Sequence, residues 1–481
     1  MIDTSCWQSL RGWAVAVLLG AVSCAGPAVE TPVAAPSRPA ALAARAADAL
    51  GSARARAAAA SLRAEQRGTY HAGEQSRTPA DPVAEAGRVY RWWYDRSRMI
   101  REAEQLFPGG IRFHSRAALT PAGGWSVDVA RWRTGTDLET VDAQTALRLR
   151  LGWERFFPHL VIAQAQAATA TLEMADDGRL RFRDAVGDTV ELTLDPATQR
   201  PARAALMADG VAQTEFVYSD YERRHGVLMP GRVQVFQRGT LQEDLRLGAT
   251  RIARPPEGQF AAPAGYVAPP APGEPSAREI APGVLYFENM PGDYHSLAID
   301  MGDHLVLVEA PLRAEYAEAQ RALLERLRPG KAVRFVLVTH HHGDHVGGLA
   351  FWAGRGATIV VPAGARVAIE RQLAARGYAG AARIEEVGAR RDFGRFVVHA
   401  FATSHSEAHL IVHLPAERLL FQGDLFYVPA RGPVPRAFPV VAELSARIDT
   451  LGLAVDRIVG VHGRVGTMAE LRDSLRLAGL R

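Results

Sequence analysis

A dense group of histidine and aspartate residues occupies the run Thr-His-His-His-Gly-Asp-His at residues 339–345. Imidazole nitrogens and carboxylate oxygens at this spacing are ligands for divalent metal ions. Side chains alternate in direction at the end of a strand, so His340 and His342 can point to one side while His341 points to the other. The glycine relaxes the backbone and lets the last two donors turn toward a second point. The run therefore predicts donors for two neighbouring metals.

Three further donors follow along the chain, each at the end of an apolar segment. His405 comes shortly after one strand, Asp424 closes the strand 419–421, and His462 closes the apolar run 458–461. Loops at strand ends gather side chains onto a rigid sheet. We therefore expect these three residues to join the histidine-rich run in one site.

Together these elements resemble the metal signature of the metallo-β-lactamase superfamily, in the order His-x-His-x-Asp-His, a later His, an Asp in a Gly-Asp turn and a final His-Gly. The resemblance covers about residues 276–481 and implies an αβ/βα sandwich with a site for two metals. It implies that His340, His342 and His405 bind the first metal, that Asp344, His345 and His462 bind the second, and that Asp424 bridges both.

The resemblance also implies a chemistry. Nitrogen and carboxylate ligands without thiolate suit two zinc ions, with iron or manganese as alternatives. Zinc lowers the pKa of bound water from about 15.7 toward about 7, and two metals roughly 3.5–4 Å apart can also polarise a carbonyl or phosphoryl oxygen. Asp344 is the candidate catalytic residue, because it can orient the hydroxide and take up its proton. In having aspartate at position 424, the sequence resembles the glyoxalase, lactonase and general hydrolase branches of the superfamily.

Other polar residues near these motifs have different expected roles. Tyr294 and His295 precede the strand around residues 297–299, and Tyr427 follows the Gly-Asp turn. We treat these three as candidate substrate contacts. His341 should face away from the metals, and a structural role is expected for it.

Two domains are expected to carry these residues. Period-two alternation across much of residues 88–253 predicts a mostly antiparallel β structure, and an Ala- and Arg-rich helix is expected over residues 41–66. Residues 41–253 are thus interpreted as an α+β domain of unknown role, whose tryptophans should form its core. A Pro-rich linker covers residues 254–275. Alternating strands and helices then predict an α/β domain at residues 276–481.

The N-terminal end reads as an export signal over residues 1–23. A short apolar run ends at Ala21-Val22-Ser23-Cys24, which resembles a bacterial lipobox, and an Ala- and Pro-rich tether covers residues 24–40. Ordinary cleavage at Ala21 and Ser23 is the alternative. The prediction is a periplasmic or envelope protein, with membrane contact only through a lipid on Cys24.

Composition narrows the choice of partners. The chain has 481 residues, a net charge of +4, and only Cys6 and Cys24 as cysteines. Two or three domains are expected at this length. Arginine is scattered rather than clustered, so no nucleic-acid interface is predicted. A small molecule is the expected partner, and the sequence gives no indication of the oligomeric state.

The leading hypothesis is a metal-dependent hydrolase in which two zinc ions share a hydroxide that attacks a small ester, thioester, lactone or amide, β-lactams included. One alternative is a mono-iron sulfur dioxygenase of the same fold, which would keep ligands such as His340, His405 and Asp424. Another is a non-catalytic envelope lipoprotein whose β domain binds a lipid or a partner. Metal analysis distinguishes the first two hypotheses.

Overall fold

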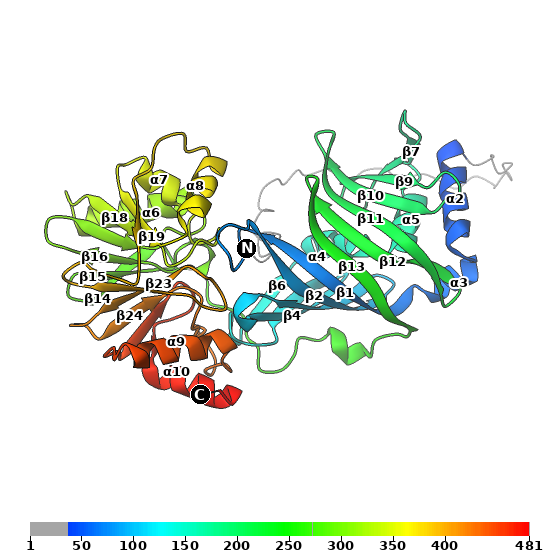
Figure 1. Ribbon diagram of the computed structural model, residues 1–481. Helices are drawn as coiled ribbons and strands as arrows, with labels where there is room; N and C mark the ends of the chain where they lie inside the picture. The colour runs from blue at the N-terminus through cyan, green and yellow to red at the C-terminus, as the bar shows by residue number, and fades with distance from the viewer. Residues whose placement is uncertain (1–36, 272, 481) are drawn as a thin grey trace, which may run out of the picture.

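The computed structural model describes residues 37–271 and 273–480. The predicted export signal at residues 1–23, the lipidation candidate Cys24 and most of the predicted tether lie outside these residues. The described chain forms an N-terminal part built on one large antiparallel sheet and a C-terminal α/β sandwich (Figure 1). Within the described ranges, none of the helices has the length and apolarity needed to cross a membrane.

The N-terminal sheet is ordered β6-β5-β4-β3-β2-β1-β13-β12-β11-β10-β9-β8-β7. Its first and last strands pair antiparallel in the middle, with Leu62 opposite Ile252, and two meanders run outward from this pair. The strands are β1 (Ser61–Gly73), β2 (Val83–Asp95), β3 (Arg98–Leu106), β4 (Arg112–Thr120), β5 (Gly123–Asp128), β6 (Leu138–Val141), β7 (Glu173–Met174), β8 (Leu180–Arg183), β9 (Thr189–Leu194), β10 (Pro201–Ala208), β11 (Val211–Arg224), β12 (Val227–Gln237) and β13 (Thr240–Ile252).

The helix expected over residues 41–66 is wrong at both ends. The structure has two shorter helices, α2 (Arg38–Leu50) and α3 (Ala53–Ala58), followed by β1 from Ser61. Leu62, Ala64 and Gln66 are buried while the residues between them are half-buried or exposed. This period of two belongs to a strand, and pairing with β2 and β13 stabilises it over the helical preference of the preceding alanines.

The core of this domain lies between one face of the sheet and the helices α4 (Ala143–Glu154) and α5 (Pro158–Ala167). The fully buried ring of Trp92 packs 6.0 Å from that of Trp153 and 5.1 Å from that of Phe156. The predicted linker, residues 254–275, packs in part against this domain. Its short helix η2 (Glu257–Phe260) docks on the sheet, where the indole nitrogen of Trp125 donates to the Phe260 carbonyl at 2.7 Å.

The C-terminal sandwich has two sheets facing each other, with helices on the outside of each (Figure 1). This is the αβ/βα architecture expected from the sequence, and the prediction of the fold class is confirmed. The first sheet comprises β14 (Ser276–Ala281), β15 (Val284–Glu288), β16 (Leu297–Asp300), β17 (Leu305–Val308), β18 (Val333–Leu337), β19 (Thr358–Pro362) and β20 (Ile384–Val387), with helices α6 (Ala314–Leu327), α7 (Leu349–Ala353) and α8 (Arg366–Ala375).

Two helices cover the second sheet, α9 between β24 and β25 and α10 after β26. Leu444 of α9 and Leu471 of α10 pack against Leu420 and Ile458 of the sheet. These elements are β21 (Arg390–Asp392), β22 (Val397–Phe401), β23 (His409–Leu414), β24 (Leu419–Gln422), β25 (Arg457–Gly460), β26 (Gly466–Thr467), α9 (Pro439–Thr450) and α10 (Met468–Ala478).

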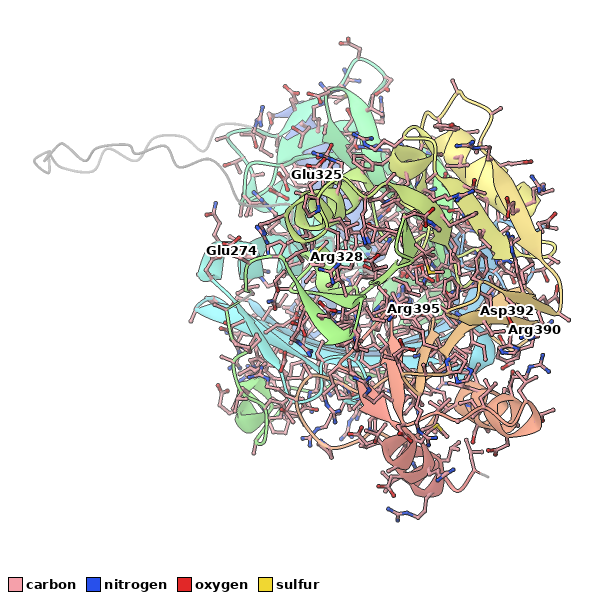
Figure 2. All side chains as sticks on the ribbon, turned by 90° about the vertical axis from the view of Figure 1, so that its left-hand side faces the viewer. Glu274, Glu325, Arg328, Arg390, Asp392 and Arg395 are labelled. Atoms are coloured by element: carbon pink, nitrogen blue, oxygen red, sulfur yellow. The ribbon has the colours of Figure 1, made fainter. Side chains whose placement is uncertain are left out.

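Three segments of the N-terminal domain reach the sandwich. They are the loop between β1 and β2, residues 74–82, the short helix η1 (Pro108–Gly110) between β3 and β4, and the loop between β5 and β6, residues 129–137. The opposite face of the sandwich, turned away from the N-terminal domain, carries charged side chains that pair with one another (Figure 2). Arg328 contacts Asp300 at 3.0 Å, and Arg395 contacts Glu417 at 2.8 Å. The N-terminal domain, by contrast, contacts the loops at the strand ends of the sandwich and the start of α9.

Candidate metal centre

The structure gathers the seven ligands named from the sequence into two overlapping groups. The first contains His340, His342, His405 and Asp424, and the second contains Asp344, His345, Asp424 and His462. Within each group the donor atoms lie within 4.8 Å of one another. Asp424 belongs to both groups, which is the position that a bridging carboxylate requires. That these residues bind metal stays a prediction.

Strand ends position these donors. The strand β18, which is buried at its C-terminal end, leads into His340, while β24 and β25 end just before Asp424 and His462. Gly423 allows the closest approach of these loops, because a Cβ at that position would lie 2.1 Å from the hydroxyl oxygen of Thr339. Asp424 itself has a φ of 58°, in the left-handed region that few residues other than glycine adopt. Such strain at a polar residue is typical of functional sites.

Hydrogen bonds orient the imidazoles. His345 Nδ1 lies 3.1 Å from the carboxylate of the fully buried Glu309, which also accepts from the backbone nitrogen of Thr339 at 2.8 Å. His340 Nδ1 lies 3.0 Å from the Thr339 hydroxyl. Contacts of this kind fix which ring nitrogen is free to bind a metal. In both histidines the nitrogen that faces the centre is Nε2. This atom lies 3.9 Å from an Asp424 oxygen in His340 and 3.3 Å from one in His345.

His342 gives an independent indication that the site suits a metal. Its Nε2 lies 2.8 Å from the backbone oxygen of Ser76, so this nitrogen carries the proton. The other nitrogen, Nδ1, is buried and has no hydrogen-bond partner in the part of the chain that the structure describes. A buried polar atom left without a partner destabilises a fold by about 1–3 kcal/mol. His342 belongs to the first donor group and its Nε2 is occupied by the Ser76 carbonyl, so a cation bound there would satisfy Nδ1.

The electrostatics of the centre also favour a cation. Burial disfavours a charged imidazole, yet the carboxylates of Asp424, Asp344 and Glu309 hold the pKa of His345 well above its usual range. Burial disfavours a charged carboxylate too, yet His345 and His462 hold the pKa of Asp424 well below its usual range. Buried carboxylates at this density need positive charge beside them, and divalent cations supply it. The donor atoms are nitrogen and oxygen only, a set that zinc, iron and manganese all accept.

A third cluster, on the N-terminal sheet, is formed by Glu102, Glu104 and His114. Its charge is already balanced, because Arg91 and Arg112 both form ion pairs with Glu104. His114 also lies 2.8 Å from Glu102. We therefore assign this cluster to the surface charge network of the sheet.

The predicted catalytic residue, Asp344, is held from both domains. The amide of Gln75 in the β1–β2 loop donates to one carboxylate oxygen at 2.6 Å, and the hydroxyl of Tyr294 donates to the other at 2.7 Å. Burial, together with the charge of Asp344, raises the pKa of Tyr294 well above its usual value, so its hydroxyl stays a neutral donor. His345 counteracts burial and holds the pKa of Asp344 below its usual range.

The N-terminal domain makes further contacts with the donor loops. Its Glu74 carbonyl accepts from the backbone nitrogen of Gly343 at 2.8 Å, and its side chain pairs with Arg371 at 2.7 Å. The Pro108 carbonyl in η1 lies 3.5 Å from His405 Nδ1. Residues Gln75, Ser76 and Pro108 were not identified from the sequence, because loop residues carry no periodicity that indicates such distant partners.

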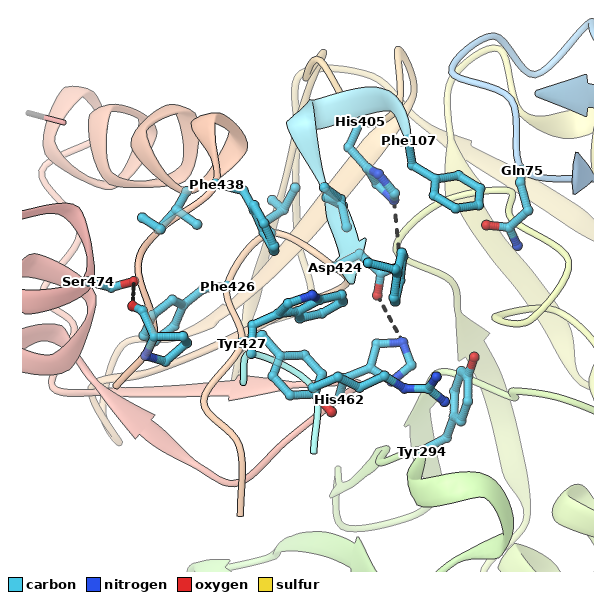
Figure 3. A pocket seen from close by; sticks show the side chains of 18 of the residues that line it. Gln75, Phe107, Tyr294, His405, Asp424, Phe426, Tyr427, Phe438, His462 and Ser474 are labelled. Atoms are coloured by element: carbon cyan, nitrogen blue, oxygen red, sulfur yellow. Dashed lines mark hydrogen bonds and ion pairs between the residues drawn. The ribbon is translucent and has the colours of Figure 1, made fainter. Parts of the chain in front are cut away.

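A pocket of about 350 Å³ opens onto the centre (Figure 3). Asp424 lies at its base between His405 and His462, and Tyr294 and Tyr427 line its wall, as proposed for substrate contacts. His295 does not line the pocket, since its ring is buried against Tyr286 and its Nδ1 lies 3.1 Å from the Phe287 carbonyl.

Trp132 departs from the expectation that the tryptophans form a domain core. It lines the pocket instead, and its ring packs edge-on against Tyr427 at 5.0 Å and Phe438 at 5.2 Å. These contacts join the two domains. A tryptophan in a loop has no sequence pattern that separates such an interdomain position from a core position.

The chain is similar to several known proteins over part of its length. A hydroxyacylglutathione hydrolase from Rhizobium meliloti (strain 1021) is 34% identical over 114 residues, which make up 23% of this chain and 41% of that protein. The match thus spans about two fifths of the relative's length. Among solved structures, the metallo-β-lactamase FIM-1 from Pseudomonas aeruginosa in its mono-zinc form is 18% identical, with 44% of this chain and 97% of that chain covered and a TM-score of 0.35. A metallo-β-lactamase from Hirschia baltica is also 18% identical, with 42% and 97% covered and a TM-score of 0.34.

The family model of the metallo-β-lactamase superfamily matches residues 291–466. This region contains the histidine-rich run together with His405, Asp424 and His462, and it coincides with most of the sandwich. Residues 291–466, which form most of the C-terminal domain, therefore match the metallo-β-lactamase superfamily.

Proposed function

We propose that the protein is a metal-dependent hydrolase of a small ester, thioester, lactone or amide. The observation that carries this proposal is the pair of donor groups that share Asp424, because two complete groups suit a dinuclear site. The partial relation to a hydroxyacylglutathione hydrolase is in keeping with a hydrolytic reaction. Zinc is the proposed metal, and iron and manganese are the alternatives.

The chain's own residues fit the requirements of hydrolysis. Two bound divalent cations would acidify a shared water and polarise the substrate oxygen. Asp344 would accept the proton of the nucleophile, because its carboxylate is ionised at neutral pH and the donors Gln75 and Tyr294 fix its orientation. The apolar walls of the pocket would exclude bulk water from the reacting groups.

The second donor group favours this proposal over a mono-iron dioxygenase. Such an enzyme needs only one metal, whereas Asp344, His345 and His462 form a further group with Asp424 that could hold a second ion.

The test is a substrate screen with purified full-length protein loaded with zinc, iron or manganese. Thioesters, lactones, β-lactams, aryl esters and phosphodiesters form the panel. We expect hydrolysis of at least one of the first four classes, its loss on removal of metal by a chelator, and its return when metal is restored. Equal hydrolysis by metal-free protein, or oxygen consumption with a persulfide substrate by an iron-loaded form, would contradict the proposal.

A further inference from the structure

The pocket above the candidate metal centre has a wall made by the N-terminal domain. Phe107, Ile111, Phe113, Trp132 and Arg133 all line it. None of them falls within residues 291–466, the part of the chain that matches the superfamily. The N-terminal domain therefore contributes groups to this pocket that the superfamily domain alone does not contain.

This wall is largely aromatic and continuous across the two domains. Phe107 packs against Phe113 with ring centres 5.6 Å apart, and Phe113 packs against Trp132 at 4.7 Å. Trp132 then contacts Tyr427 and Phe438 of the sandwich. Such a surface binds apolar groups by removing them from water, and its stacked rings accept flat or extended ones.

Arg133 is the polar exception in this wall. Its side chain is half-buried, and among the described residues its guanidinium forms no hydrogen bond or ion pair. Of the other arginines at the pocket, Arg313 has Glu315 at 3.5 Å, and Arg436 is exposed to solvent. A half-buried guanidinium without a partner, beside apolar rings, is suited to bind a carboxylate or another anionic group of a ligand.

We propose that the N-terminal domain selects the substrate of the hydrolytic site. The selected class is an acyl compound with an extended apolar group, which contacts Phe107, Phe113 and Trp132, and with an anionic group that Arg133 binds. This inference rests on the proposed function, since it names the substrate class of the same site. Arg133 is thereby a specificity-determining residue, and it takes no part in the reaction itself.

Two aryl esters of equal chain length test the anion preference. The 4-nitrophenyl ester of hexanoic acid is neutral, whereas the mono-4-nitrophenyl ester of adipic acid ends in a carboxylate. In metal-loaded protein, Arg133→Gln should raise KM for the adipate ester about 10- to 100-fold, as expected for loss of a hydrogen-bonded charge. It should leave the hexanoate ester unchanged, and Arg133→Lys should restore part of the preference.

The matched control is Arg472→Gln, which changes an exposed arginine of α10 outside the pocket. It should change neither ester. The apolar wall is tested with Phe113→Ala, which should lower the preference for hexanoate over acetate esters by roughly 10-fold. Equal effects of Arg133→Gln on both six-carbon esters, or no effect on either, would overturn the assignment of Arg133.

A binding measurement keeps the inference testable if no ester is hydrolysed. Calorimetric titration of the metal-loaded protein with 1-naphthalenesulfonate and with the neutral 1-naphthalenemethanol compares an apolar anion with its uncharged analogue. The anion should bind more tightly, and Arg133→Gln should weaken its affinity about 10-fold or more without changing that of the alcohol. If no ester is hydrolysed but the anion binds in this way, the proposed function alone would be refuted. Equal binding of both compounds by the wild type would refute the inference.

Discussion

Asp424 is the residue that the two donor groups share. It lies within reach of His340, His345, His405 and His462, with its carboxylate oxygens 3.3–3.9 Å from their ring nitrogens. Asp424→Ala should therefore lower metal content and hydrolytic rate together. The loss should exceed the roughly 10–100-fold that changes to outer partners of a metal ligand produce. Elemental analysis and kinetics on the same preparation measure both quantities.

His341 is the control for this prediction because it lies inside the same run. Its Nδ1 lies 3.5 Å from the Ser406 hydroxyl, and it belongs to neither donor group. His341→Ala should cause the smaller loss of metal and rate. If Asp424→Ala retains its full metal content, or if His341→Ala proves the more damaging change, the assignment of the donors is wrong.

Among the structural elements, the β1–β2 loop has the most direct effect on the centre. Gln75→Ala removes one of the two hydrogen bonds to the carboxylate of Asp344 and leaves Tyr294 as the other donor. We expect weaker binding of the second metal, by about 10–100-fold, and a matching fall in rate. Competition with a chromophoric zinc chelator measures the affinity. Gln213→Ala, on β11 in the same domain, should leave it unchanged.

The helix α5 carries a pH-sensitive group far from the pocket. Burial lowers the pKa of His159 to about 4 from an ordinary value near 6.5, so the folded β domain binds this proton less readily than the unfolded chain does. The free energy of unfolding should therefore be unaffected above pH 6.5 and should fall by about 3 kcal/mol as the pH drops from 6.5 to 4. Urea unfolding at several pH values, followed by tryptophan fluorescence, measures the slope of the unfolding free energy against pH.

The variant His159→Gln removes the titrating group, so its unfolding free energy should depend less on pH across that window. His225→Gln, which changes an exposed histidine, should keep the wild-type slope. Parallel slopes in the wild type and His159→Gln would show that other groups cause the acid sensitivity.

These elements also show what sequence reasoning can and cannot reach. The sites of His340 and Asp424 were predictable, because ligand spacing and strand ends are local features. The contact between Gln75 and Asp344 was not, because it joins positions 269 residues apart through the docking of two domains. The local sequence at the start of β1 predicts a helix wrongly for a related reason, since tertiary pairing with β2 and β13 outweighs local propensity there.

For the whole molecule the expected metal content is two ions per chain. The two donor groups and their shared carboxylate carry this prediction. Full-length protein prepared in metal-buffered medium should contain two equivalents by elemental analysis. Removal of both ions should lower the unfolding temperature, because binding to the folded state alone stabilises it. One equivalent or none in a protein that is otherwise fully folded would count against the dinuclear site.

The pairing of β1 with β13 makes the candidate metal centre depend on the folding of the whole first domain. The sheet is complete only when residue 252 pairs back onto β1 at the other end of the domain. The carbonyls of Ser76 and Pro108, which contact His342 and His405, lie in segments that connect strands of this sheet. A chain whose first domain misfolds would lack these contacts, so the metal content of a preparation should report on the folding of both domains.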